Sequence, residues 1–368
     1  MQINKLYLRG FRNYEEASVE LDAGVNLFLG DNAQGKTNLL EAVTYLSAGR
    51  SYRTHREAEL IGFGQDFAEL HAAVRSYDRE KDLRVLLFAG QKKRQLFLSG
   101  VKKKTFSELS GHLSCVLFCP EDLMVLRTGA QERRRLIDNA LCQLRPAYAE
   151  ALSEYTRVLE HKNRILKDRF EDPSLTELLP EFNEQLCRSG AEVVRNRATY
   201  LRFLAEYGER YHRAFSGEKE QLRVEYRTVS TVDDPFADSE TVYGRLREHL
   251  ESHWRAELDS AQCLTGPHKD DFDVFLNDIS LKSYGSQGQT RTAAISLKLA
   301  EREIFREDTG EEPVLLLDDV LSELDASRQD FVLNQLRSGQ VLITCCEMDR
   351  LTEIGKMFHV KHGQVEAM

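Results

Sequence analysis

Residues 25–46 constrain this chain more than any other part of its sequence. Val25–Leu29 is a short, mostly apolar run typical of a buried strand, and the next eight letters, GDNAQGKT, match GxxxxGK[ST] at every required position. Leu39, Val43 and Leu46 then recur at helical spacing. A strand, a glycine-rich loop and a helix start together present backbone N–H groups to phosphate, so we predict a nucleotide site.

The loop residues have separate expected roles. Lys36 would place its ammonium group against the β- and γ-phosphate oxygens, and the Thr37 hydroxyl would take one Mg²⁺ position. The alternative is a glycine turn that opens an ordinary helix, which is disfavoured because both flanks fit a phosphate-binding loop. The predicted nucleotide contacts are Gly30, Asp31, Asn32, Ala33, Gln34, Gly35, Lys36, Thr37 and Asn38.

Length and composition restrict the class of protein. The 368 residues suffice for two or three domains, and 41% apolar and 30% charged residues are typical of a globular chain. No run approaches the ~20 apolar residues of a membrane span. Lys5, Arg9 and Arg12 interrupt any secretion signal, so we expect a soluble, cytoplasmic protein with no membrane partner. The seven cysteines fit no metal pattern, and we expect buried thiols.

Strand signals dominate the first 119 residues. Apolar or alternating runs predict strands at residues 3–8, 17–21, Val25–Leu29, 69–75, 83–88 and Gln95–Leu98. We expect residues 66–119 to form an antiparallel β lobe beside the nucleotide strand.

Helical spacing takes over after residues 120–122. A helix is predicted at residues 131–144, and two later apolar stripes keep the spacing of a coiled-coil seam on either side of Pro173. The stripes are Tyr148, Leu152, Tyr155, Leu159 and Leu166, and then Cys187, Ala191, Val194, Ala198, Leu201 and Ala205. We therefore expect a helical hairpin that forms an arm.

An α/β pattern returns in the last part of the chain. Strands are predicted at residues 222–226, 272–276, 314–319 and 340–344, and helices at residues 242–254, 290–305 and 326–336. The expected fold class is α/β. Residues 1–122 and 259–368 would build one nucleotide-binding body, and residues 123–258 would be the inserted helical arm.

Two acids close the apolar run at residues 314–319. Asp318 would hold Mg²⁺, directly or through water, because a buried parallel strand would deliver its carboxylate beside the P-loop. Asp319 could act as general base on the attacking water, which makes Lys36 and Asp319 the predicted catalytic residues. The alternative is that both acids cap the next helix, and a P-loop in the same chain argues against it.

Spacing separates the classes of P-loop protein. About 280 residues divide the P-loop from the acidic strand, far more than in compact P-loop folds, and the lack of Asn-Lys-x-Asp counts against a guanine-specific GTPase. Between them lies SQGQ at a helix start, which could bind phosphate, although a plain N-cap would explain it alone. The further predicted nucleotide contacts are Ser286, Gln287, Gly288, Gln289 and, in the SELD loop, Asp325.

The order of P-loop, SQGQ signature, acidic strand and SELD loop resembles ABC/SMC ATPase heads. Strings across nearly the whole chain resemble the RecF family of bacterial DNA replication and repair proteins. They are LRGFRNY (8–14), GDNAQGKTNLLEA (30–42), PEDL (120–123), RRRxxD (133–138), GPHKDDF (266–272), SQGQTR (286–291) and LDDVLSELD (317–325). Asp319 departs from the ABC pattern, where most members have Glu, and Thr344 stands near the usual His. The shorter acid suits slow hydrolysis.

The resemblance implies an ABC/SMC-like P-loop head that uses ATP and Mg²⁺ as a weak ATPase. ATP would be buried between two protomers, with Lys36, Thr37, Asp318 and Asp319 from one and Ser286 and Gly288 from the other. An ATP-dependent homodimer would thus close on DNA, and slow hydrolysis would open it. Family resemblance also implies partners: RecO and RecR, with which such proteins place RecA at single-strand gaps and duplex junctions during DNA repair and the SOS response.

A clamp on DNA needs basic residues, and the net charge of −10 confines them to local patches. The candidates, of which we expect at most half to touch phosphate, are Arg50, Arg53, Arg56, Lys92, Lys93, Lys102, Lys103, Lys104, Arg133, Arg134 and Arg135. A transporter-type ABC nucleotide-binding subunit is the first alternative, disfavoured by the helical insertion and by the lack of LSGGQ. A binding protein with a vestigial ATP site is the second, disfavoured by intact Lys36, Thr37 and Asp318.

Overall fold

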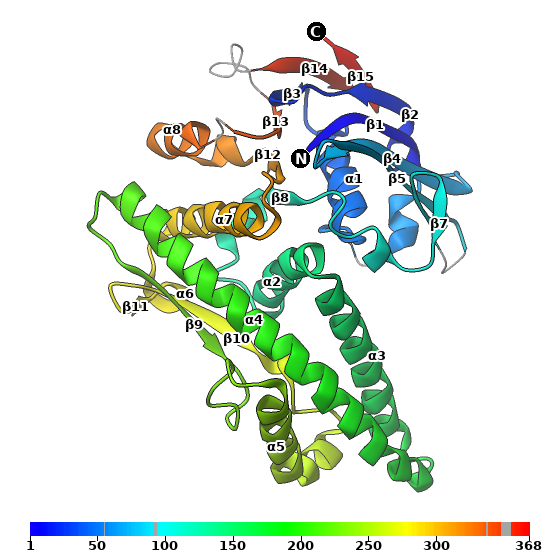
Figure 1. Cartoon of the computed structure of the whole chain (residues 1–368), viewed down its shortest axis with the longest axis vertical. Coiled ribbons are helices and arrows are strands. Elements are labelled where there is room, and N and C mark those ends of the chain that lie inside the picture. Colours follow the sequence, from blue (N-terminus) through cyan, green and yellow to red (C-terminus); the bar gives the residue numbers. More distant parts are fainter. Residues whose placement is uncertain (55, 91–93, 336–337, 347–354) are drawn as a thin grey trace. The chain divides into compact units, whose positions relative to one another are not determined.

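The computed structural model describes residues 1–54, 56–90, 94–335, 338–346 and 355–368. Lys92, Lys93 and Leu336, which figured in the predictions above, lie outside these ranges. The chain divides into two compact units (Figure 1). We call Met1–Met124 with Arg291–Met368 the head, and Val125–Thr290 the arm. Across the described ranges, no helix is long and apolar enough to cross a membrane.

A mainly parallel sheet in the head carries the P-loop. Its strand order is β15-β14-β3-β13-β12-β8, and β3, β13 and β12 run parallel as neighbours. These strands are almost continuously apolar and buried, as is usual for a parallel sheet covered on both faces. The bounds are β3 Val25–Leu29, β8 Cys115–Phe118, β12 Val314–Asp318, β13 Val341–Cys345, β14 Lys356–Lys361 and β15 Gln364–Ala367.

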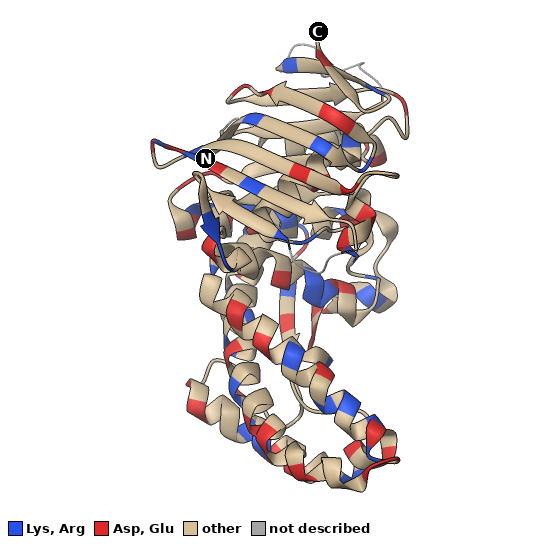
Figure 2. Cartoon of the chain, turned by 90° about the vertical axis from the view of Figure 1, so that its right-hand side faces the viewer, with Lys and Arg blue, Asp and Glu red and all other residues tan. Residues whose placement is uncertain are grey.

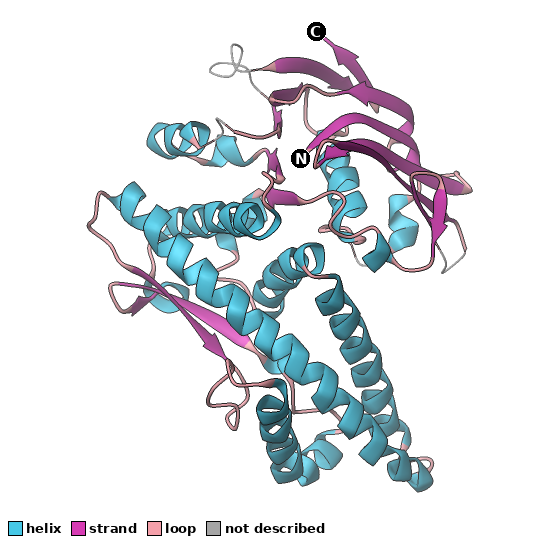
Figure 3. Ribbon diagram, in the orientation of Figure 1, coloured by secondary structure: helices cyan, strands magenta, loops and turns pink. Residues whose placement is uncertain are grey.

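A second, antiparallel sheet lies in the head, in the order β2-β1-β4-β5-β6-β7. Burial alternates along β4, as expected for a sheet with one face on the core. The helix α1, Lys36–Ala48, packs between the two sheets, and Leu39, Leu40 and Val43 are fully buried in the shared core (Figure 3). The strand bounds are β1 Gln2–Phe11, β2 Tyr14–Glu20, β4 Phe67–Ser76, β5 Arg79–Phe88, β6 Gln95–Leu98 and β7 Val101–Lys103.

The predicted extent of the antiparallel lobe, residues 66–119, is wrong at both ends. The sheet also contains β1 and β2 from the N-terminal segment, and it ends at β7. Cys115–Phe118 pairs instead with β12 in the parallel sheet. Its run of apolar residues without alternation suits a strand buried on both faces, which explains the difference.

Helices complete the head. The helix α7, Gln287–Thr309, contains the boundary between arm and head and starts three residues earlier than predicted. The helix α8, Ala326–Asn334, follows the SELD loop. Short 3₁₀ helices are η1 Glu57–Leu60, η2 Phe106–Glu108, η3 Pro120–Met124 and η6 Val320–Glu323.

The arm contains the expected helical hairpin. The helices α3, Pro146–Asp168, and α4, Leu179–Ser216, pack side by side and are joined through η4, Pro173–Leu178 (Figure 1). Cys187, Ala191 and Val194 of the predicted stripe are buried against α5. The other bounds are α2 Ala130–Leu144, β9 Leu222–Arg227, α5 Ser239–Ser260, η5 Pro267–Lys269, β10 Asp271–Leu276, β11 Ile279–Ser280 and α6 Leu281–Tyr284.

The second domain boundary differs from the expected one. We placed residues 259–290 in the nucleotide-binding body, whereas the structure places them in the arm. The reason is strand pairing, because β10 is antiparallel to β9 along its whole length and β11 extends the same sheet. The signature, residues 286–289, therefore belongs to the arm.

The two polar motifs RRRxxD and GPHKDDF bond to each other inside the arm. Arg133 donates from Nε and Nη2 to the Asp271 carboxylate at 2.6 and 2.7 Å. Arg197 donates to both oxygens of Asp138 at 2.9 Å. Arg133 is 1% exposed, so its expected contact with DNA is wrong: the side chain is a buried partner of Asp271. Burial raises the pKa of the neighbouring Asp270 to about 6.

Candidate nucleotide-binding site

The P-loop backbone adopts conformations that its sequence permits. Gly30 and Gly35 have φ of 157° and 119°, and a Cβ on Gly30 would lie 2.2 Å from the Val360 carbonyl oxygen. Asn13 donates from Nδ2 to the Gln34 carbonyl at 2.9 Å, and the Tyr14 hydroxyl donates to the Gly35 carbonyl at 2.9 Å. The end of the LRGFRNY string therefore fixes the loop, a role that its letters did not reveal.

The Lys36 ammonium group is hydrogen-bonded inside the loop. Its Nζ donates to the carbonyl oxygens of Gly30 and, at 2.9 Å, Asp31, and to the Cys346 sulfur at 3.3 Å. These acceptors are uncharged, so a phosphate would be a stronger partner for the ammonium group. The first turn of α1 holds no acidic residue, so the positive end of the helix dipole is available to a bound anion.

Cys346 corrects one expectation about the thiols. The other six cysteines are buried, whereas Cys346 is exposed and its sulfur also donates to the Asn32 side chain at 3.1 Å. It follows the end of β13, which brings it beside the P-loop.

Asp318 lies against the P-loop at the end of β12. Its Oδ1 accepts from the Thr37 hydroxyl at 2.9 Å and from the Thr344 hydroxyl at 2.8 Å, and its Oδ2 accepts from the Tyr52 hydroxyl at 2.9 Å. The carboxylate is 5% exposed and all three donors are neutral. A carboxylate beside a threonine hydroxyl is the oxygen set that Mg²⁺ takes. Sequence reasoning missed Tyr52 because it lies 266 residues away.

Asp319 has an unsatisfied oxygen. Its backbone is left-handed, with φ of 51°, and its N–H donates to the Thr344 hydroxyl at 3.0 Å. Among the described residues, its buried Oδ1 has no hydrogen-bond partner. Burial raises the pKa of this carboxyl, against the opposing charge of Lys36. The free oxygen beside Asp318 is suited to accept from a water molecule.

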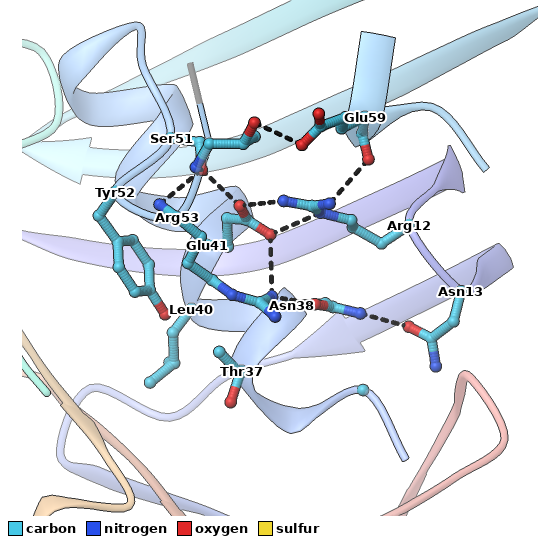
Figure 4. A network of polar contacts seen from close by, with 12 residues as sticks. Arg12, Asn13, Thr37, Asn38, Leu40, Glu41, Ser51, Tyr52, Arg53 and Glu59 are labelled. Carbon is cyan, nitrogen blue, oxygen red and sulfur yellow. Dashed lines mark hydrogen bonds and ion pairs between the residues drawn. The ribbon is translucent and has the colours of Figure 1, made fainter. Parts of the chain in front are cut away.

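A buried glutamate ties the site to the basic loop at residues 49–56 (Figure 4). Glu41 on α1 is fully buried and accepts two bonds from Arg12 at 2.8 and 2.7 Å and one from Ser51 at 2.5 Å. Arg53 lies 3.3 Å from the same carboxylate and donates to the Asn38 side chain at 2.7 Å. The β1–β2 turn, the P-loop helix and the basic loop therefore share one network.

An open pocket of about 1000 Å³ adjoins this network in the head. Arg12, Asn13, Asn38 and Arg53 line it from the P-loop side. Phe63, which is fully exposed, lines it from the loop that follows η1. The pocket combines an aromatic side chain with polar groups next to the predicted phosphate loop.

The signature begins α7 in the arm. Ser286 and Gln289 bond reciprocally, because the Ser286 hydroxyl accepts from the Gln289 N–H at 3.1 Å and the Gln289 Oε1 accepts from the Ser286 N–H at 3.1 Å. Ser286 and Gln287 are exposed, Gly288 and Gln289 half-buried. Asp325 caps α8 by accepting from the Arg328 N–H at 3.0 Å and also pairs with that side chain.

Comparisons with known proteins agree across the chain. The family model described as RecF/RecN/SMC N terminal domain matches residues 2–367. A DNA replication and repair protein RecF of Agathobacter rectalis is 38% identical over 372 residues, covering 100% of this chain and 99% of the relative. A structure of the recombination mediator protein RecF with ATPrS is 33% identical, with a TM-score of 0.93 and coverage of 100% of this chain and 98% of that one.

The Smc head domain of Pyrococcus furiosus, with an extended coiled coil, shows the fold alone. It is 16% identical, with a TM-score of 0.57 and coverage of 100% of this chain and 95% of that one. The predicted ABC/SMC-like fold class is confirmed. The family predicted from the seven strings is confirmed as well, and the chain belongs to the RecF family of DNA replication and repair proteins.

Proposed function

We propose that this protein binds ATP with Mg²⁺ and hydrolyses it slowly, as a conformational switch. Lys36 would leave its carbonyl partners and donate to the β- and γ-phosphate oxygens. Thr37 and Asp318 would hold the metal ion, which when bound supplies positive charge to the phosphates. Asp319 would accept a proton from the attacking water at its unpaired Oδ1.

One observation carries this assignment. The Thr37 hydroxyl and the Asp318 carboxylate, 281 residues apart, meet at 2.9 Å, and the next residue has a buried carboxylate oxygen with no partner in the described part of the chain. Two oxygen ligands for a metal ion and an acceptor for a water molecule would thus lie together beside Lys36. The adjoining pocket with Arg12 and Phe63 would take the adenosine part of the nucleotide.

The switch would be a homodimer that shares two ATP molecules. Ser286, Gln287, Gly288 and Gln289 of one protomer would reach the nucleotide of the other, joined by Asp325 of the SELD loop. Each charge-assisted hydrogen bond to the γ-phosphate is worth about 1.5–3 kcal/mol. Losing three of them on hydrolysis would weaken the dimer by several orders of magnitude, because about 1.4 kcal/mol is tenfold.

The closed dimer would hold DNA at gaps or duplex junctions and act with RecO and RecR to load RecA. The support is family membership and the name of a matched structure, which places that RecF in the RecFOR pathway. Of the expected phosphate contacts, Arg53, Arg56, Lys102 and Lys104 are exposed. Figure 2 shows basic and acidic residues interspersed along the helices and strands of the chain.

Sedimentation of the protein with ATP, with ADP and without nucleotide tests the switch. We expect dimers with ATP alone, and retention of gapped duplex DNA by those dimers with a steep fall in affinity as salt rises. A DNA affinity that does not change with salt would contradict contacts between the protein and DNA phosphates. If Lys36→Arg and Asp318→Asn leave dimerisation and DNA binding unchanged, the ATP site is vestigial and the proposal fails.

Mixing two inactive variants tests whether the sites are shared. Lys36→Met damages the P-loop, and Ser286→Arg blocks the signature. A mixed dimer would contain one intact site, so the mixture should recover ATP turnover that neither variant has. If the mixture recovers none, the two protomers do not complete each other's sites.

A further inference from the structure

The last residue of the signature is bound to the end of the long arm helix. The Gln289 Nε2 donates to the Glu220 Oε1 at 2.9 Å, while the Gln289 Oε1 accepts from the Ser286 N–H. Glu220 follows the C-terminus of α4, 69 residues before Gln289. All of these residues belong to the arm, so the contact lies within one compact unit.

Glu220 is itself held in place from α4. Its Oε2 bonds to the His212 Nε2 at 3.0 Å, and its backbone N–H donates to the Ser216 hydroxyl at 3.3 Å. His212 is fully buried. Burial lowers the pKa of His212 and the Gln289 bond lowers the pKa of Glu220, so the pair consists of a neutral imidazole that donates to a carboxylate.

The carboxylate fixes which way the Gln289 amide points. A carboxylate can only accept, so it takes the amide nitrogen and leaves the amide oxygen for the Ser286 N–H. The Ser286 hydroxyl in turn accepts from the Gln289 N–H, which leaves its own O–H group able to donate elsewhere. Ser286 is exposed, and this O–H group would donate a hydrogen bond to a phosphate oxygen.

A second contact holds the other side of the signature. Arg127, which precedes α2, donates from its guanidinium to the carbonyl oxygen of Gly285, the residue before Ser286. The start of α7 is therefore fixed from α4 on one side and from the entry to α2 on the other.

We propose that Glu220, supported by His212, is a positioning residue for the signature, so that the end of α4 sets the orientation of Ser286. This inference rests on the proposed shared ATP site. Loss of the Glu220 carboxylate would let the Gln289 amide rotate and misplace the Ser286 hydroxyl, and small misplacements of this kind cost about 100-fold in rate.

The test compares Glu220→Ala with the conservative Glu220→Gln. The glutamine keeps an oxygen that accepts from Gln289, and its NH₂ group can donate to the other tautomer of the neutral His212. We therefore expect near-normal ATP turnover from it and a loss of about 10- to 100-fold from the alanine variant. The control is Glu206→Ala, an exposed glutamate on the same helix. Equal turnover of Glu220→Ala and Glu206→Ala would overturn the inference.

Mixed dimers separate a positioning role from a general defect. Glu220→Ala should recover turnover when mixed with Lys36→Met, which contributes an intact signature, but not when mixed with Ser286→Arg. Recovery in both mixtures, or in neither, would refute the role in the signature. The mixture of Lys36→Met with Ser286→Arg tests the shared site itself. If that mixture recovers no ATP turnover, the proposed shared site is wrong, and this outcome is distinct from a failure of the role of Glu220.

Hydrogen exchange provides a readout without nucleotide. In Glu220→Ala the backbone amides at residues 287–290 should exchange faster than in the wild type, with an unchanged thermal midpoint for the head. Unchanged exchange at these amides would show that Glu220 does not hold the signature.

Discussion

Replacing Lys162 with methionine removes the positive charge from a fully buried ion pair. The Lys162 Nζ lies 2.6 Å from the Glu257 Oε2, joining α3 to α5, and both side chains are fully buried. The other carboxylate oxygen accepts from the Leu264 N–H at 2.7 Å. Methionine keeps most of the volume, so the main effect is a buried carboxylate without its cation. Breaking such a pair costs about 3–5 kcal/mol in the free energy of unfolding while the remaining group stays charged.

The cost has an upper limit that depends on pH, because the carboxyl group can take up a proton. Protonating an ordinary glutamate costs about 3.7 kcal/mol at pH 7 and about 1 kcal/mol at pH 5. Over this range the folded variant binds a proton that its unfolded chain does not bind. Its stability therefore falls relative to the wild type as pH rises, by up to about 1.4 kcal/mol per pH unit.

Urea unfolding followed by circular dichroism at pH 5, 6 and 7 measures this slope. The double variant Lys162→Met with Glu257→Gln is the control, because it has no carboxyl group to titrate and should lose the extra pH dependence. A Lys162→Met variant as stable as the wild type at pH 7 would refute the reasoning, and so would a penalty that stays constant with pH.

Three other changes probe buried ionisable groups. Glu41→Gln removes the charge that two arginines share and should cost about 2–4 kcal/mol by calorimetry, whereas an unchanged transition would contradict the network. Arg133→Ala should cost about 3–5 kcal/mol in urea unfolding and the more exposed Arg135→Ala under about 0.5, and equal costs would contradict the buried assignment. Burial lowers the pKa of His268 to about 4, so the wild type should lose up to about 3 kcal/mol relative to His268→Gln as pH falls from 6.5 to 4. A difference in unfolding free energy between the wild type and His268→Gln that stays constant from pH 7 to pH 4.5 would contradict the lowered pKa of His268.

The strand and the helix that flank the P-loop could be predicted from the sequence because their signals are local. Val25–Leu29 forms the predicted strand to the residue, since its apolar run and the following glycine mark both ends. The acidic strand ends at Asp318, one residue before its predicted end, because the backbone of Asp319 turns left-handed. Parallel strand ends then meet at one edge of the sheet, which brings Asp318 to Thr37.

Contacts between distant segments could not be predicted. Tyr52 and Thr344 reach Asp318 only because the fold brings a loop and a neighbouring strand to it, and neither residue type indicates this by spacing. The sequence around Arg133 suggests surface charge, because nothing in it indicates the ion pair with Asp271, 138 residues away, that accompanies burial of the arginine. Residues 259–290 were assigned to the wrong unit. The alternation of apolar and polar residues predicts the strand β10, but it does not indicate that β10 pairs with β9.

Asp319 combines a left-handed backbone with a buried side-chain oxygen that has no partner among the described residues. A left-handed backbone at a residue other than glycine costs roughly 1–2 kcal/mol, and a buried oxygen without a partner costs about 1–3 kcal/mol. Stability alone would favour glycine here, because glycine relieves the backbone and removes the orphan oxygen. The chain retains both costs next to the carboxylate that meets Thr37. Backbone strain of this kind clusters at functional sites, so the conformation of Asp319 supports the nucleotide site proposed here.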